Sequence, residues 1–351
     1  MHDHTNKRRA GTWRQIALLL LFLVISVSVV LGFANPREFA STIASAAWSW
    51  MIVSVLLFAL SFYLWAWLYR LGLAAAEVNV RTVGLLGPVM VSIFLNTAAP
   101  VGEAVFVDYA VERGQSGAKA AAGTILALAV DLGTTVPFII AGLVFLRSEG
   151  QLPVYYVIVS AMFVFVVLLM FAALWVAKVR PLWLEAALRW SQRVVNRAAR
   201  LLKRRQRELG TWANRSATQF SEAAAYMTRR RGTLALSVGV GLLFHAVNAA
   251  GLYTLCLAFG EKVSLGTVTA AFSMSVVLYV IAITPQGVGP TEGVMALLLT
   301  NKGMGSAVAV VTALTYRILN IWVPILIGYL VARRMRIFGG HAVAPDHNPG
   351  Y

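Results

Sequence analysis

The stretch TPQGVGPTE, from Thr284 to Glu292, interrupts an apolar run that would otherwise be a membrane helix. Its prolines lack a backbone N–H donor and its glycines relax the backbone, so no continuous helix runs through it. In a bilayer, the freed backbone groups must bond to protein or to water in a cavity, because lipid tails offer no hydrogen bonds. This stretch, called the second break below, therefore predicts a broken membrane helix that faces the protein interior.

A similar stretch, NTAAPVGE, lies earlier in the chain, from Asn96 to Glu103, and is called the first break. Each break ends in a glutamate, and each glutamate is followed at the same spacing by a glycine, Gly114 or Gly303. We interpret the pair as an internal repeat, with chance similarity among apolar helices as the alternative. Two apolar segments interrupted by Gly and Pro are typical of a transporter that binds its substrate near the bilayer midplane.

The composition indicates an integral membrane protein. Of the 351 residues, 59% are hydrophobic and 13% are charged, and the mean hydropathy is +0.74. These values exclude an ordinary water-soluble domain. The single cysteine, Cys256, excludes an intramolecular disulfide and a cysteine-based metal site. The net charge of +16 comes from basic residues between and beside apolar spans, which favours an anionic membrane surface over nucleic acid as the partner.

The predicted fold is an all-α polytopic membrane protein with about six full transmembrane helices and two broken hairpins. The full spans are expected at residues 16–33, 43–69, 120–146, 154–177, 234–259 and 307–331, and the hairpins at 85–112 and 265–300. Basic flanks place both termini in the cytoplasm. The first hairpin then enters from the cytoplasm and the second from outside, which makes the repeat an inverted one.

Charge divides the chain further. A basic cytoplasmic N-terminus (1–15) precedes the first membrane half (16–177), and a basic amphipathic segment (178–232) precedes the second half (233–332). The remaining residues, 333–351, form a basic tail that is expected to be disordered. Apolar residues recur every seven positions in the amphipathic segment, which favours a helix on anionic headgroups, either as a topological anchor or as a docking surface.

Ionisable side chains at membrane depth are costly, so they mark candidate functional sites. Five qualify here: Glu103, Asp108, Asp131, Glu292 and Arg317. Asp131 and Arg317 lie in corresponding helices of the two copies, and Asn320 shares the face of Arg317. Both a structural ion pair and a head-group site fit Asp131 and Arg317.

The two breaks offer further candidate groups. Glu103 and Glu292 begin the second arms of the hairpins, where a carboxylate caps a helix or binds a proton, a sodium ion or a lipid amine. The backbone N–H groups of Gly102, Gly287 and Gly289 are candidate phosphate donors, assisted by Arg317. On another span, His245 and Asn248 share one face, as interhelical hydrogen-bond partners or as a proton relay.

No motif of an enzyme is present in the sequence: it has no P-loop and no His/Glu zinc helix. We therefore expect no catalytic residue, no cofactor and no metal ion.

The order and spacing of the residues in the two breaks and the following helices resemble those of a known family. That family is the flippase-like membrane domain of lysylphosphatidylglycerol synthases, which also occurs as stand-alone proteins, and the resemblance covers about residues 14–336. It implies a membrane domain that moves aminoacylated phospholipid between leaflets, while a separate soluble domain transfers the amino acid from tRNA. We expect no synthase activity here, because the chain ends at Tyr351 without such a domain. The matching residues are Asn96, Pro100, Gly102, Glu103, Asp131, Pro285, Gly287, Gly289, Glu292 and Arg317.

The sequence thus predicts a flippase-like protein of the bacterial inner membrane that binds and translocates a phospholipid or other polar lipid. Arg317 and the glycine turns would take the phosphate, and the acids would take cationic or hydroxyl groups. Two alternatives remain: a non-transporting partner of a glycosyltransferase or lipid-modifying enzyme, and an ion-coupled transporter of a small solute. The expected substrate-binding residues are Glu103, Asp131, Gly287, Gly289, Glu292, Arg317 and Asn320.

Overall fold

The computed structural model describes residues 41–97, 101–150, 152–179, 231–282 and 284–334, and all regular structure in these ranges is helical. Five helical runs are long and apolar enough to cross a membrane. They are α3 (Trp48–Ala75), α6 (Gly117–Ser148), α7 (Val154–Val179), α10 (Arg231–Ala258) and the run that joins α13 (Ser306–Arg317), the π-helical turn η3 (Ile318–Trp322) and α14 (Val323–Arg334). The chain is a polytopic all-α membrane protein.

These five runs match five of the six predicted spans. The sixth, at residues 16–33, lies outside the described residues, and so do the N-terminus 1–15, residues 180–230 of the basic segment and the tail from 335 onward. The described spans differ from the predicted ones by a few residues at their ends. The largest difference is at α3, which begins at Trp48 and continues to Ala75, past the predicted end at residue 69.

The two predicted hairpins are formed by short helices. In the first, η1 (Val83–Leu85) and α4 (Leu86–Leu95) precede the first break, and α5 (Ala104–Val111) follows it. In the second, α11 (Leu265–Ile281) precedes the second break, which contains the short turn η2 (Pro285–Gly287), and α12 (Pro290–Thr300) follows it. The helix α12 begins at Pro290, two residues before Glu292, which was predicted to begin this arm, because proline is suited to the first helical turn.

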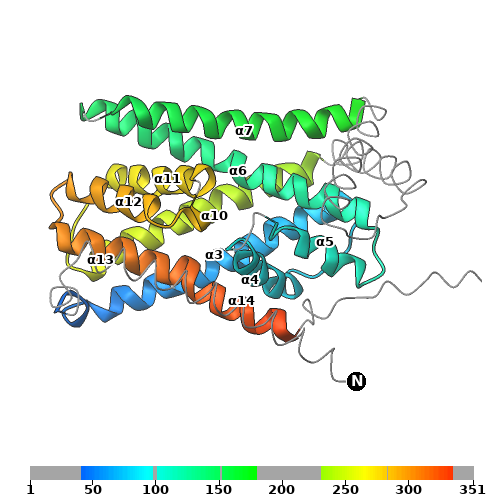
Figure 1. Cartoon of the computed structure of the whole chain (residues 1–351), viewed down its shortest axis with the longest axis horizontal. Coiled ribbons are helices and arrows are strands. Elements are labelled where there is room, and N and C mark those ends of the chain that lie inside the picture. Colours follow the sequence, from blue (N-terminus) through cyan, green and yellow to red (C-terminus); the bar gives the residue numbers. More distant parts are fainter. Residues whose placement is uncertain (1–40, 98–100, 151, 180–230, 283, 335–351) are drawn as a thin grey trace, which may run out of the picture.

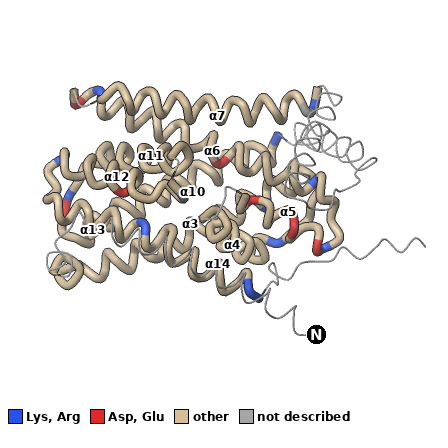
Figure 2. The backbone as a smooth tube through the Cα atoms, viewed as in Figure 1, with Lys and Arg blue, Asp and Glu red and all other residues tan. Residues whose placement is uncertain are grey.

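The helices run mostly along the longest axis of the molecule (Figure 1). The hairpin of α11 and α12 lies in one half of this axis and the hairpin of α4 and α5 lies in the other, on the left and right of the view. The C-terminal ends of α7 and α14 are both on the right, at the same end as α5. Most coloured charged residues in Figure 2 lie towards the two ends of the molecule, and only a few lie between them.

The tips of the two hairpins meet in the interior. The side chain of Val288, from the second break, packs in the apolar cluster that α4, α5 and α14 form around Phe94 and Phe106. In the same break, the Gln286 side-chain amide donates a hydrogen bond to the Ile93 carbonyl oxygen of α4 at 2.7 Å. The second break is therefore anchored on the first hairpin as well as on its own helices.

The last crossing is interrupted by the π-helical turn at Ile318–Trp322, directly after Arg317. Pro324 is the second residue after this turn. It has no backbone N–H, and in a regular helix its ring would clash with the carbonyl group one turn earlier. A wider turn accommodates such a ring, and wide turns occur often at functional sites.

Candidate functional site

A buried ion pair closes the second break. The Arg317 Nε lies 2.6 Å from Glu292 Oε1, and Arg317 Nη2 donates to the Gln286 carbonyl oxygen at 2.6 Å. Arg317 is 3% exposed and Glu292 is 9% exposed. The second carboxylate oxygen of Glu292 accepts the Gly289 N–H at 2.7 Å. Glu292 is therefore both the partner of Arg317 and the N-terminal cap of α12, as its position at the start of the arm predicted.

The backbone of the second break needs its glycines. Gly287 and Gly289 have φ of 66° and 92°, a region that side chains with a Cβ rarely adopt. Gln286 has φ of 56° in spite of its side chain, and such a conformation persists only where the surroundings hold it. Two bonds hold it here, from its own amide to Ile93 and from Arg317 to its carbonyl oxygen.

In the described residues of the first break, the glutamate has an amide as its partner and not a cation. The Asn96 side chain bridges this break, since its Nδ2 donates to Glu103 Oε1 at 3.2 Å and its Oδ1 accepts the Gly102 N–H at 2.7 Å. Glu103 precedes α5 but its side chain makes no capping hydrogen bond there, so the predicted capping role is wrong for this residue. It is only partly buried, and its described polar partner is a neutral amide.

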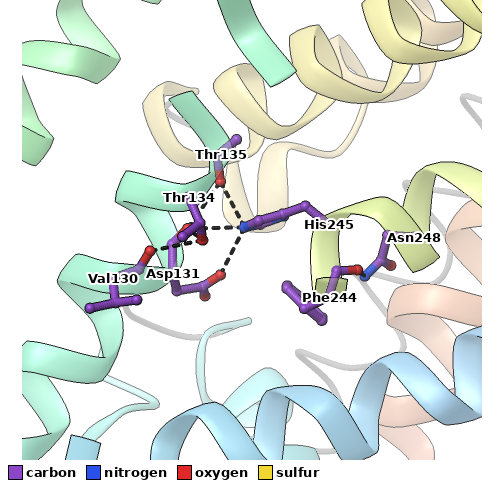
Figure 3. A network of polar contacts seen from close by, with 7 residues as sticks. All are labelled: Val130, Asp131, Thr134, Thr135, Phe244, His245 and Asn248. Carbon is purple, nitrogen blue, oxygen red and sulfur yellow. Dashed lines mark hydrogen bonds and ion pairs between the residues drawn. The ribbon is translucent and has the colours of Figure 1, made fainter. Parts of the chain in front are cut away.

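A third polar group lies between α6 and α10 (Figure 3). The His245 Nε2 is 3.2 Å from Asp131 Oδ1, 2.9 Å from the Asp131 carbonyl oxygen and 3.0 Å from Thr135 Oγ1. All three residues are buried. The prediction that His245 bonds between helices is confirmed. Asn248 instead donates to the Phe244 carbonyl oxygen of its own helix.

Two tyrosines lie near these groups. Tyr279, near the end of α11, lies close to Glu103, Arg317 and Asp131. Tyr69, which is fully buried on α3, lies close to Glu103, Asp131 and Tyr279, and its ring stacks on Phe106 of α5. The polar residues of both breaks and of the α6–α10 contact, which lie around these tyrosines, are called the charged centre below.

The chain matches the lysylphosphatidylglycerol synthase TM region family over residues 15–328, which includes both breaks and every residue of the charged centre. The chain belongs to this family. Two archaeal relatives are similar over nearly their whole length. A UPF0104 membrane protein of Pyrococcus horikoshii is 22% identical over 91% of this chain and 97% of its own length. Another, from Methanothermobacter thermautotrophicus, is 20% identical over 87% of this chain and 91% of its own.

In this member of the family, the partners of the charged residues differ from two sequence-based expectations. Asp131 and Arg317 do not pair with each other. Asp131 pairs with His245, and Arg317 pairs with Glu292. Asn320 does not join Arg317 either, since its amide donates to the Tyr316 hydroxyl at 3.0 Å, across the π-helical turn.

The glycine turns also differ from their predicted role as phosphate donors. The Gly102 and Gly289 N–H groups donate to Asn96 and Glu292, and the Gly287 N–H donates to the Thr284 carbonyl oxygen. A phosphate would have to displace these internal acceptors. The glycines serve the backbone conformation of the breaks rather than an open anion site.

Three residues of the centre carried a weaker signal in the sequence. Gln286 is a polar residue that stands between a proline and a glycine in the second break, and this position favours a structural or binding role for its side chain. Tyr69 and Tyr279 stand near helix ends, where tyrosine more often marks the membrane interface, so their pattern did not indicate a place in the centre. In the described ranges, no group of three or more His, Cys, Asp and Glu side chains is placed to hold a metal ion.

Proposed function

We propose that this protein binds a lipid by its polar head group and moves it between the two leaflets of the membrane. The observation that carries the proposal is the charged centre itself. It contains the buried pairs Arg317–Glu292 and His245–Asp131, and the Gln286 amide joins the second break to the first hairpin beside it. Ionisable groups inside a membrane are expensive to keep, and they mark substrate pathways. The family description, which names a lysylphosphatidylglycerol synthase, supports a phospholipid as the substrate class.

The pairing of the charges indicates which part of a head group the centre binds best. Arg317 is already neutralised by Glu292, so a lipid phosphate must compete with that carboxylate. Glu103 has an amide as its partner and Asp131 has a histidine, so both keep acceptor capacity. We therefore assign the ammonium or hydroxyl groups of the head group to Glu103 and Asp131, and the phosphate to Arg317 in competition with Glu292.

The proposed path follows from the two hairpins, which lie in opposite halves of the molecule (Figure 1). We place the protein in the plasma membrane with both termini in the cytoplasm, so that each hairpin admits a head group from a different side. The charged centre then lies between the two entrances, as it does in transporters with inverted repeats.

Native mass spectrometry of the purified protein tests the binding step. We expect phospholipid to remain bound to the wild-type protein and to be lost at least tenfold more readily from Glu103→Gln. The matched control is Asp108→Asn, which removes an exposed carboxylate from α5, the short helix that follows Glu103, and should retain lipid as the wild type does. Equal lipid retention by all three proteins contradicts the assignment of the head group to Glu103.

A further inference from the structure

The α6–α10 contact differs from the other charged groups of the centre in one respect. Glu292 is neutralised by an arginine, whose charge is permanent, whereas Asp131 is paired with His245, whose charge depends on protonation. Within the described part of the chain, His245 is the only cationic side chain at ion-pair distance from Asp131. The net charge at this contact is therefore variable, while the charge at the second break is fixed.

The hydrogen bonds define where the first proton resides. The Asp131 carbonyl oxygen and carboxylate can only accept hydrogen bonds, and both lie within 3.2 Å of His245 Nε2. Nε2 must therefore carry a hydrogen. Thr135 also lies within reach of Nε2, and its hydroxyl donates onward to the Asp131 carbonyl oxygen at 3.2 Å. With Nε2 protonated and Nδ1 free, the imidazole is neutral and the buried carboxylate has no counter-charge.

The surroundings make that charged state costly. His245 is 4% exposed, and its ring is packed by Phe138, Phe244 and Phe272. An uncompensated carboxylate in such surroundings is unfavourable. One added proton removes the net charge, either by converting His245 to an imidazolium beside the carboxylate or by neutralising Asp131 directly.

We infer that Asp131 and His245 together form a binding site for one proton inside the membrane, and that its occupancy alters the contact between α6 and α10. In the described part of the chain, no other acidic or basic side chain lies at ion-pair distance from either residue. The effect on lipid movement rests on the proposed function, whereas the proton site itself does not.

The helices α6 and α10 are in close contact beside Asp131 and His245, so a change of charge on this pair acts on both helices. A Cβ added at Gly241 of α10 would lie 2.6 Å from Thr134 Oγ1 of α6, so the helix backbones approach one turn from His245. Thr134 and Thr135 both bond to the Asp131 carbonyl oxygen, and they connect the titrating pair to this contact. A proton on His245 strengthens its attraction for Asp131, whereas a proton on Asp131 removes the carboxylate charge, and either change acts on the contact between α6 and α10.

Infrared difference spectroscopy of the protein in lipid nanodiscs, between about pH 5 and pH 9 where imidazole ordinarily titrates, tests the proton site. We expect one protonation signal that is lost in both Asp131→Asn and His245→Gln and kept in Thr135→Val. Asp131→Asn removes the unpaired charge without changing the shape, so it keeps the test valid if His245→Gln fails to fold. Spectra in which Asp131→Asn matches the wild type overturn the inference.

Exchange of fluorescent phosphatidylglycerol between the leaflets of proteoliposomes tests the coupling. The wild-type rate should change with pH by up to about tenfold per pH unit, the limit for one bound proton, and the rate of folded His245→Gln should not. A wild-type rate that is independent of pH contradicts the coupling. If the infrared signal is present but no lipid moves at any pH, the proton site stands and the proposed transport fails.

Discussion

The two breaks use the same residue types in different ways. Glu292 is held by a buried arginine and by a backbone N–H, whereas among the described residues Glu103 is held by the amide of Asn96. The first arrangement is rigid because both carboxylate oxygens have strong partners, and the second leaves acceptor capacity on a partly exposed carboxylate. For this reason we assign the head group to the first break and a structural role to the second.

Removal of Arg317 tests the structural role of the second break. Arg317→Leu leaves the buried Glu292 without a counter-charge, which should lower the free energy of unfolding by about 3–5 kcal/mol. Thermal or SDS-induced unfolding of the protein in detergent measures the change. The double variant Arg317→Leu with Glu292→Leu should recover most of the loss, because no uncompensated charge is left. A single variant as stable as the wild type contradicts this role.

A pair of glycine substitutions tests the backbone of the second break. Gly289→Ala places a Cβ on a residue with φ of 92°, which should cost about 1–3 kcal/mol of stability although nothing lies within 4 Å of the added carbon. The control is Gly293→Ala, in the helical part of α12 with equally open space. It should be neutral or more stable by up to about 1 kcal/mol. The same loss of melting temperature in both variants would show that backbone conformation is not the cause.

At the scale of residues, the sequence singled out ionisable groups because each one stands out in an apolar run. Asp131, Glu292 and Arg317 are buried and Glu103 is partly buried, but Asp108 is exposed. The sequence did not predict the partners of these groups. The pairing of Arg317 with Glu292 depends on how the second break folds back over α13, and the pairing of Asp131 with His245 depends on the packing of α6 against α10. Such contacts arise from tertiary packing, which residue type and spacing do not determine.

The elements themselves were predicted closely, because uninterrupted apolar runs and Gly/Pro breaks are strong local signals. The exceptions are at helix ends. Pro290 and Glu292 extend α12 towards the break by capping it, and α3 continues beyond Tyr69 because protein rather than lipid surrounds that side chain. Helix ends depend on such local bonds and contacts more than on hydropathy.

Helix packing around the first hairpin depends on one close approach. Gly328 of α14 faces the backbone of α4 so closely that an added Cβ would overlap the Met90 carbonyl group. Gly328→Ala should therefore separate the two helices and lower stability by about 1–3 kcal/mol, measured as a lower unfolding temperature. Gly239→Ala of α10, where an added Cβ meets nothing within 4 Å, is the matched control and should leave stability unchanged or slightly higher. Equal effects would contradict the close packing.

At the scale of the whole molecule, the two hairpins lie in opposite halves. The inverted order of the two copies, which rests on the basic residues, stays a prediction. Cysteine labelling tests the orientation in a membrane. In a Cys256→Ser background, Glu112→Cys and Asn301→Cys place exposed thiols after the second arm of the first and second hairpin. Membrane-impermeant reagents in intact cells should label position 301 and not position 112. Labelling of both positions from the same side contradicts the proposed topology.

The central claim is that lipid crosses the membrane by way of the charged centre. Dithionite quenching of fluorescent phosphatidylglycerol and phosphatidylethanolamine in proteoliposomes measures this movement directly. We predict that the wild-type protein and Asp108→Asn expose inner-leaflet lipid to dithionite, and that Glu103→Gln does so at least tenfold more slowly although it remains folded. Quenching that stops at the outer leaflet with the folded wild-type protein, at every pH tested, would contradict the account.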